Sequence, residues 1–172
     1  MILCGGYIFG AEYGFLLGSI TILVSAFVTG GLGPWLPYQM FAAGWVGMIA
    51  GMAGIGCKGR PSKRDVIILA AVGLVLGYGY GAVMDIWDWT FYQSSPGLGF
   101  SPGMSFLTVV NHFAKFYAAT SFVYDSFRAV GNVIMISVLG APILLALGRL
   151  RARLNTDIDE SVMLITTDVN AV

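Results

Sequence analysis

Charged residues are scarce in this chain: they make up 10% of its 172 residues, and nine basic residues balance nine acidic ones. Hydrophobic residues make up 57%, and the mean hydropathy is +0.80. A soluble domain of this length cannot cover so much apolar surface with so few charges. The lipid bilayer is therefore the expected surrounding. A net charge of zero gives no indication of a nucleic-acid partner, so none is expected.

Histidine and cysteine are nearly absent as well. His112 is the only histidine, which excludes metal sites that need two imidazoles. The Gly-Lys-Ser/Thr ending of phosphate-binding loops is also missing. We therefore expect no enzymatic activity, no ATP hydrolysis by this chain, no metal and no cofactor. Cys4 and Cys57 lie near expected cytoplasmic helix ends, where thiols stay reduced, so no disulfide is expected.

Seven of the nine basic residues fall in two clusters, each beside a long apolar stretch. Four lie within residues 58–64, and three lie within residues 149–153. Lys and Arg are retained on the cytoplasmic side during membrane insertion, so both clusters and the C-terminus are predicted to lie in the cytoplasm. We expect a transmembrane helical bundle over residues 1–153 and a flexible cytoplasmic tail over residues 154–172.

Four apolar stretches are long enough to cross a bilayer, which takes about 20 residues. We expect these spans at residues 13–29, 38–55, 66–86 and about 121–148. The first two are separated by residues 30–37, which are rich in Gly and Pro and predict a turn. The predicted fold class is an all-α membrane protein, a compact polytopic helical bundle. It has about five membrane segments when the apolar start of the chain is included.

Two segments do not have the length of a simple crossing. Residues 1–9 are apolar but make only half a crossing, and no charge precedes Glu12, so we expect the C-terminal half of a helix rather than a signal peptide. Residues 105–148 make about two crossings, yet Lys115 is costly in hydrocarbon. Two spans there would also place the second basic cluster opposite the first. We therefore predict one crossing, preceded by an amphipathic segment on the outer face.

Small residues recur at every fourth position in or beside three of these spans. A four-residue step returns to the same helix face, and small residues there let two backbones approach closely. Such a face serves either packing inside the chain or docking of a partner membrane subunit, and we take the second and third stripes as candidate docking residues. The stripes are Gly10, Gly14 and Gly18; Ala43, Gly47 and Gly51; and Gly73, Gly77 and Gly81.

Polar and aromatic residues gather at the predicted outer ends of the helices. Aromatic residues there are ordinarily anchors in the headgroup belt, and Asp125 and Arg128 simply neutralise each other in the alternative interpretation. Ionisable residues inside spans nevertheless mark functional sites, so an outer pocket is the best site candidate. Its candidate substrate-binding residues are Trp35, Tyr38, Gln39, Trp87, Asn111, His112, Asp125, Arg128 and Asn132.

One segment carries a resemblance to a known family. Residues 33–47, with the sequence GPWLPYQMFAAGWVG, resemble the substrate-binding S component of energy-coupling factor (ECF) transporters. The GFLLG segment at residues 14–18 and the stretch from Arg128 to Pro142 are similar to that family as well. The family has a first helix and most of a second before the point where this chain begins.

The resemblance implies a six-helix, multi-pass protein of a prokaryotic cell membrane. It would capture a vitamin-like small molecule at the outer face. It would then associate with a transmembrane T component and two cytoplasmic ATPase subunits that power release inward.

The ligand and two other functional classes stay open at this point. A pocket edged by aromatic and amide side chains suits a planar or bulky, mostly neutral cofactor precursor, with cobalamin or a relative as the favoured ligand and riboflavin-like ring compounds as alternatives. A structural or accessory membrane subunit would explain the glycine stripes but not the outer polar residues. An uncoupled small-solute channel would need polar residues along whole helices, and residues 66–83 and 133–147 contain almost none.

Overall fold

The computed structural model describes residues 1–57, 61–91 and 97–169, with side chains up to residue 156. These described residues form helices and connections and contain no strand, which confirms the all-α class. The elements are α1 (Ile2–Phe9), α2 (Ala11–Thr29), α3 (Leu36–Ala53), the short 3-10 helix η1 (Gly54–Gly56), α4 (Lys63–Trp89), α5 (Phe106–Thr120) and α6 (Phe122–Val169).

Four of these helices are long and apolar enough to cross a membrane. In the described part of the chain they are Ala11–Thr29, Leu36–Gly56, Lys63–Trp89 and Phe122–Thr156. Each contains or closely overlaps a predicted span, because hydropathy summed over a whole crossing dominates local preferences. The chain therefore has the architecture of a multi-pass membrane protein. The eight-residue α1 is too short to be a span and packs inside the bundle, where Leu3 and Tyr7 are buried.

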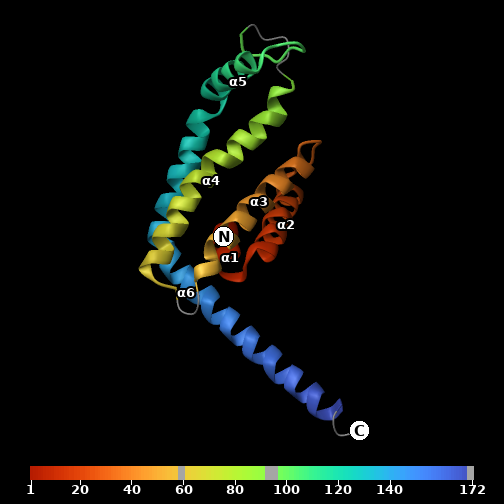
Figure 1. Ribbon diagram of the computed structural model, residues 1–172, viewed down its shortest axis with the longest axis vertical. Coiled ribbons are helices and arrows are strands. Elements are labelled where there is room, and N and C mark those ends of the chain that lie inside the picture. The colour runs from red at the N-terminus through yellow and green to blue at the C-terminus, as the bar shows by residue number, and fades with distance from the viewer. Residues whose placement is uncertain (58–60, 92–96, 170–172) are drawn as a thin grey trace.

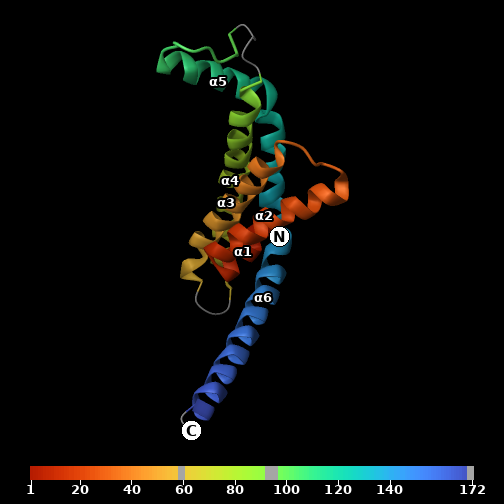
Figure 2. The ribbon, with the colours of Figure 1, turned by 90° about the vertical axis from the view of Figure 1, so that its right-hand side faces the viewer.

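The long apolar stretch 105–148 is divided into two helices, as the cost of Lys115 predicts. Ser105 is the N-cap of α5, and its hydroxyl accepts a hydrogen bond from the backbone N–H of Thr108. Ser121 is the C-cap of α5. There the chain changes direction into α6. Figure 2 shows α5 lying across the end of α4 and α6 rather than parallel to them.

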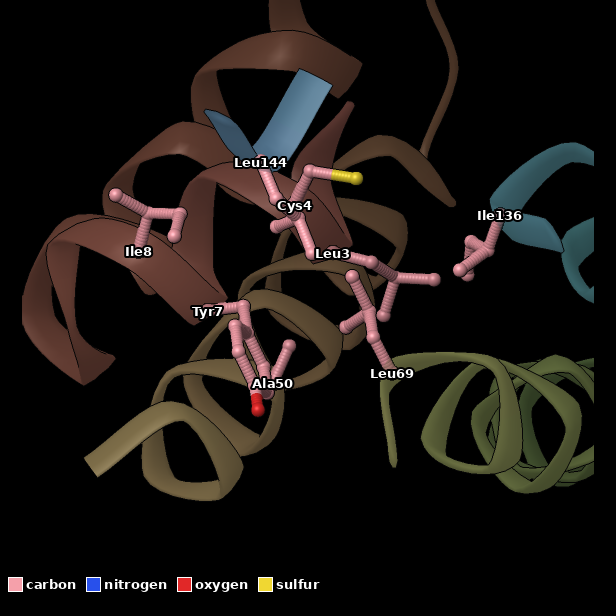
Figure 3. Packing of buried hydrophobic residues seen from close by; sticks show 8 residues of the cluster. All are labelled: Leu3, Cys4, Tyr7, Ile8, Ala50, Leu69, Ile136 and Leu144. Carbon is pink, nitrogen blue, oxygen red and sulfur yellow. The ribbon is translucent and has the colours of Figure 1, made fainter. Parts of the chain in front are cut away.

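The helices form two packed groups that α1 joins. α2 and α3 form an antiparallel hairpin, and α4 packs along α6 (Figure 1). α1 contacts both groups through a shared apolar core (Figure 3). The core residues are Leu3, Cys4, Tyr7, Ile8, Ala50, Leu69, Ile136 and Leu144. Leu69 and Leu144 are completely buried in it. α1 therefore packs between the hairpin and the α4–α6 pair and contacts both.

Glycines allow backbone contact at both helix pairs. A Cβ on Gly14 would collide with the carbonyl oxygen of Gly47, so α2 and α3 touch there through their main chains. In the second pair, a Cβ on Gly77 would lie 2.6 Å from the Cα of Ala129 on α6. The second and third stripes thus serve packing inside the chain, and their predicted docking role stays a prediction. Ala43, Gly47, Gly51, Gly73, Gly77 and Gly81 are all buried by neighbouring helices of the same chain.

Both basic clusters lie at the same end of the bundle, which we call the basic end. The Nη1 group of Arg151 donates a hydrogen bond to the carbonyl oxygen of Ile8 at 2.6 Å and so satisfies the last turn of α1. Nearby, Asp65 and Ser62 form the capping box that begins α4, and the hydroxyl of Tyr7 donates to Asp65 at 2.8 Å. Residues 58–60 of the first cluster lie outside the described residues.

The C-terminal segment is helical further than the domain prediction implies. No helix end coincides with the expected boundary after residue 153, because α6 runs on to Val169. Figure 1 shows this part of α6 projecting away from the other helices. The prediction of a flexible tail over residues 154–172 stays a prediction.

Substitution of Gly77 by Leu is expected to destabilise the bundle strongly. The new side chain would force α4 away from Ala129, and overpacking of this kind costs about 1–3 kcal/mol or more. Gly79→Leu is the matched control, because a Cβ on Gly79 has no atom within 4 Å. Thermal unfolding of both variants in detergent measures the difference. Equal midpoints would show that the α4–α6 contact does not limit stability.

Labelling with an impermeant thiol reagent tests the orientation in the membrane. In a background without Cys4 and Cys57, we expect Ser101→Cys to react from outside intact cells and Ala152→Cys to react only after permeabilisation. Both positions are exposed in the structure; position 101 lies in the connection before α5, and position 152 lies on α6 within the second basic cluster. Reaction of the cysteine at position 152 in intact cells would reverse the predicted topology.

Candidate functional site

Three polar residues of α6 lie over the glycine stripe of α4. The side-chain N–H of Asn132 donates to the carbonyl oxygen of Gly73 at 3.0 Å. One turn further along, Arg128 Nη1 donates to the carbonyl oxygen of Gly77 at 3.5 Å. Because glycine has no side chain, the main-chain carbonyls of Gly73 and Gly77 are accessible to α6. Asn132 and Arg128 therefore have hydrogen-bond partners at membrane depth within the α4–α6 pair.

Asp125 completes this series where α4 approaches its end. Its side chain lies over Gly81, and a Cβ at Gly81 would overlap the carboxylate. Asp125 is only 1% exposed, accepts a hydrogen bond from the hydroxyl of Tyr117 at 2.9 Å, and forms an ion pair with Arg128. The expected pairing of Asp125 with Arg128 is thus present. The hydrogen bond from Tyr117 to Asp125 also attaches α5 to the bundle.

Tyr117 lies on α5, outside the spans. Burial, the hydrogen bond to Asp125 and the carboxylate's charge raise the pKa of Tyr117 to about 12. A tyrosine with this pKa stays protonated at physiological pH, because its ordinary pKa is already about 10. Its hydroxyl therefore remains a donor to Asp125. The stabilisation from this bond is complete below about pH 10 and is lost as the pH rises through about 12.

A second buried carboxylate, Asp85, lies one turn from Gly81 on the same face of α4. The Asp85 side chain is 4% exposed, and its Oδ1 accepts a hydrogen bond from the hydroxyl of Ser121 at 2.5 Å. Its Oδ2 is buried and has no hydrogen-bond partner among the described residues. Two buried carboxylates therefore meet one guanidinium at the junction of α4, α5 and α6.

A cleft of about 520 Å³ lies between the two helix groups, and we call it the central cleft. Its polar lining consists of Arg128 and Asn132 from α6, Tyr80 from α4 and Thr21 from α2. The guanidinium carbon of Arg128 is 5.0 Å from the centre of the Tyr80 ring, and 40% of the Arg128 side chain is exposed. The remaining walls are apolar and come from α1, α2, α3 and α4. Apolar residues in this lining include Leu3, Ile22, Val46 and Leu76.

The other predicted site residues are divided between two places. Tyr38 and Trp87 pack together with ring centres 5.6 Å apart, which joins the start of α3 to the end of α4. Trp35 is exposed, and Gln39 is partly buried on the first turn of α3. None of these four residues lines the central cleft.

His112 and Asn111 lie on α5 and are separate from the central cleft. The Nδ1 atom of His112 lies 2.9 Å from the carbonyl oxygen of Gly99 in a hydrogen bond. Trp89 donates to the carbonyl oxygen of Leu98 at 2.6 Å, so the two side chains fasten the connection before α5. Asn111 is exposed. The predicted outer pocket is therefore not one site, and of its nine residues only Arg128 and Asn132 line the cleft.

Sequence reasoning did not select three residues that matter here. Tyr80 and Thr21 line the cleft, and Asp85 lies in the carboxylate network. A signal existed for Asp85, because it continues the four-residue step of Gly73, Gly77 and Gly81. Within the described residues, no three His, Cys, Asp or Glu side chains are grouped to hold a metal ion.

The fold and the cleft together define a multi-pass α-helical membrane protein with a mainly apolar cleft that carries a few polar side chains. Comparison with models of protein families, with curated proteins and with solved structures finds no match for this chain.

Substitution of Asp125 by Ala is expected to reduce stability by about 1–3 kcal/mol, since it leaves the hydroxyl of Tyr117 without its acceptor and the partly exposed Arg128 without its counter-ion. Asp88→Ala serves as the control, because Asp88 is an exposed aspartate on the neighbouring helix α4. The double variant Asp125→Ala/Arg128→Ala should lose less than the sum of the two single variants. Additive losses in thermal or denaturant unfolding would contradict the ion pair.

Proposed function

We propose that this chain is the capture subunit of an ECF-type uptake transporter and binds a vitamin-like small molecule in the central cleft. One observation carries the proposal. The cleft combines a guanidinium, an amide and a phenol ring with apolar walls, at the depth of the predicted spans. Ligand cavities characteristically have a mainly apolar lining with a few placed polar groups. An ionisable residue at membrane depth also marks a functional site.

The lining favours a mostly neutral ring compound. Tyr80 and the apolar walls supply contact area, while Asn132 and Arg128 supply orientation. The charge of Arg128 is balanced by Asp125, so the cleft does not call for a strongly anionic ligand. Its volume of about 520 Å³ lies within the range of cavities for drug-sized molecules. The sequence favours cobalamin or a relative and leaves riboflavin-like compounds as alternatives, and a flavin-sized ring system fits this volume better than a complete corrinoid.

The energy source and the partners rest on the resemblance of residues 33–47 to S components. We propose that a T component and two cytoplasmic ATPases drive release, since the chain has no phosphate-cradling glycine motif of its own. The small-residue stripes of α3 and α4 are used inside the chain. A T component would therefore bind other surfaces.

Ligand binding by the purified protein tests the proposal. A panel of vitamins and cofactor precursors is screened by thermal shift in detergent, and the affinity of the hit is measured by titration. Asn132→Ala should weaken binding by about 1–3 kcal/mol, or roughly tenfold to a hundredfold, because a buried polar group of the ligand loses its partner. Asn111→Ala is the matched control, because it removes an exposed amide outside the cleft and should leave the affinity unchanged.

Three outcomes would count against the proposal. Full-strength binding by Asn132→Ala would remove the central cleft from the site. No binding of any compound would favour a structural or accessory subunit. Passive flux of small solutes through proteoliposomes that contain only this chain would favour the channel alternative.

A further inference from the structure

The carboxylate network at the junction of α4, α5 and α6 has more negative groups than it has cations. Asp85 and Asp125 are both at least nine-tenths buried, and Arg128 is the cation that pairs with Asp125. Asp85 receives one neutral hydrogen bond, from Ser121, while its Oδ2 has no partner among the described residues. An ionised Asp85 would be a buried charge without a counter-ion of its own, which is strongly unfavourable.

We infer that Asp85 is a proton-binding site and carries its carboxyl group as the neutral acid when the protein is folded. The charge balance of the network supports this assignment, since one proton on Asp85 leaves the Asp125–Arg128 pair electrically neutral. The proton comes from water and forms an O–H bond on the carboxylate, with no other reactant. The titratable and charged groups around Asp85 are Asp88 and Tyr78 on α4, Tyr117 on α5, and Asp125 and Arg128 on α6.

A proton fits the surroundings of Asp85 better than a larger occupant does. Asp85 does not line the central cleft or either of the two clefts at the basic end. The described residues also contain no group of three or more acidic, His or Cys side chains for a metal ion. A proton requires no space beyond the carboxyl group itself.

Proton binding at Asp85 also affects the attachment of α5. Ser121 ends α5 and donates to Asp85, while Tyr117 of α5 donates to Asp125 one turn away on α6. Loss of the proton would place a second negative charge near Asp125, at the junction where both hydrogen bonds attach α5. The inference does not depend on the proposed function, because its test needs no ligand.

Infrared spectroscopy of the purified protein in detergent detects the proton directly. At neutral pH we expect the C=O stretching band of a protonated carboxyl group, present in the wild type and in Asp88→Asn and lost in Asp85→Asn. Asp88 is the matched control because it is an exposed acid one turn away on α4. If Asp85→Asn does not fold, Ser121→Ala decides instead, since loss of its hydrogen bond shifts the band of a protonated Asp85.

Thermal unfolding gives an independent readout. If folded Asp85 holds a proton that the unfolded chain releases, the wild-type midpoint falls as the pH rises above the ordinary range of an aspartate, because the folded state binds more protons. Asp85→Asn should lack this part of the pH dependence, and Asp88→Asn should keep it. Wild-type spectra without a protonated carboxyl band, or identical pH profiles in the three proteins, would overturn the inference. Stabilisation of the wild type, but not of Asp85→Asn, by NaCl over choline chloride would assign a metal cation instead.

Discussion

Close contact between α4 and α6 requires small residues on one helix and satisfied polar groups on the other. Gly73, Gly77 and Gly81 provide the first condition, because side chains at these positions would collide with α6. Asn132, Arg128 and Asp125 provide the second, since each lies against one glycine of the stripe. In lipid, no hydrophobic drive brings helices together, so van der Waals contact and interhelical hydrogen bonds must do so. The position of α5 and one wall of the central cleft both depend on this contact.

The α2–α3 hairpin reaches the same closeness by a different route. There the contact is between main chains, with Gly14 against Gly47, and it needs no charged residue. The hairpin and the α4–α6 pair are therefore packed by different means. α3 also contacts α4 directly, and the central cleft lies between the two groups beside that contact. α1 fills the basic side of this space, and Arg151 on α6 holds its last turn. On the opposite side lies the central cleft, which is lined by Arg128, Asn132 and Tyr80.

Polar residues in this bundle serve two purposes at once, because an unpaired polar group in hydrocarbon is costly. Arg128 pairs with Asp125 and also presents its exposed edge to the cleft. Asn132 donates to Gly73 and lines the same cleft. A ligand in the cleft would therefore contact side chains that already hold two helices together. Binding of a ligand there would therefore be coupled to the packing of α4 against α6.

The sequence by itself determined the features that depend on hydropathy or charge summed over many consecutive residues. The four spans, the separate α5 and the two basic clusters follow from hydropathy and charge, because insertion into lipid depends on sums over about 20 residues. The glycine stripes likewise predicted close helix packing. A stripe identifies a helix face but not the helix that covers it, so the docking role of Gly47 and Gly77 could not be separated from internal packing. Only the tertiary structure decided that α6 covers α4, that Asp125 is buried with Tyr117, and that Asn111 and His112 lie apart from Arg128. Those outcomes depend on contacts between residues far apart in sequence, for which a single chain carries no local signal.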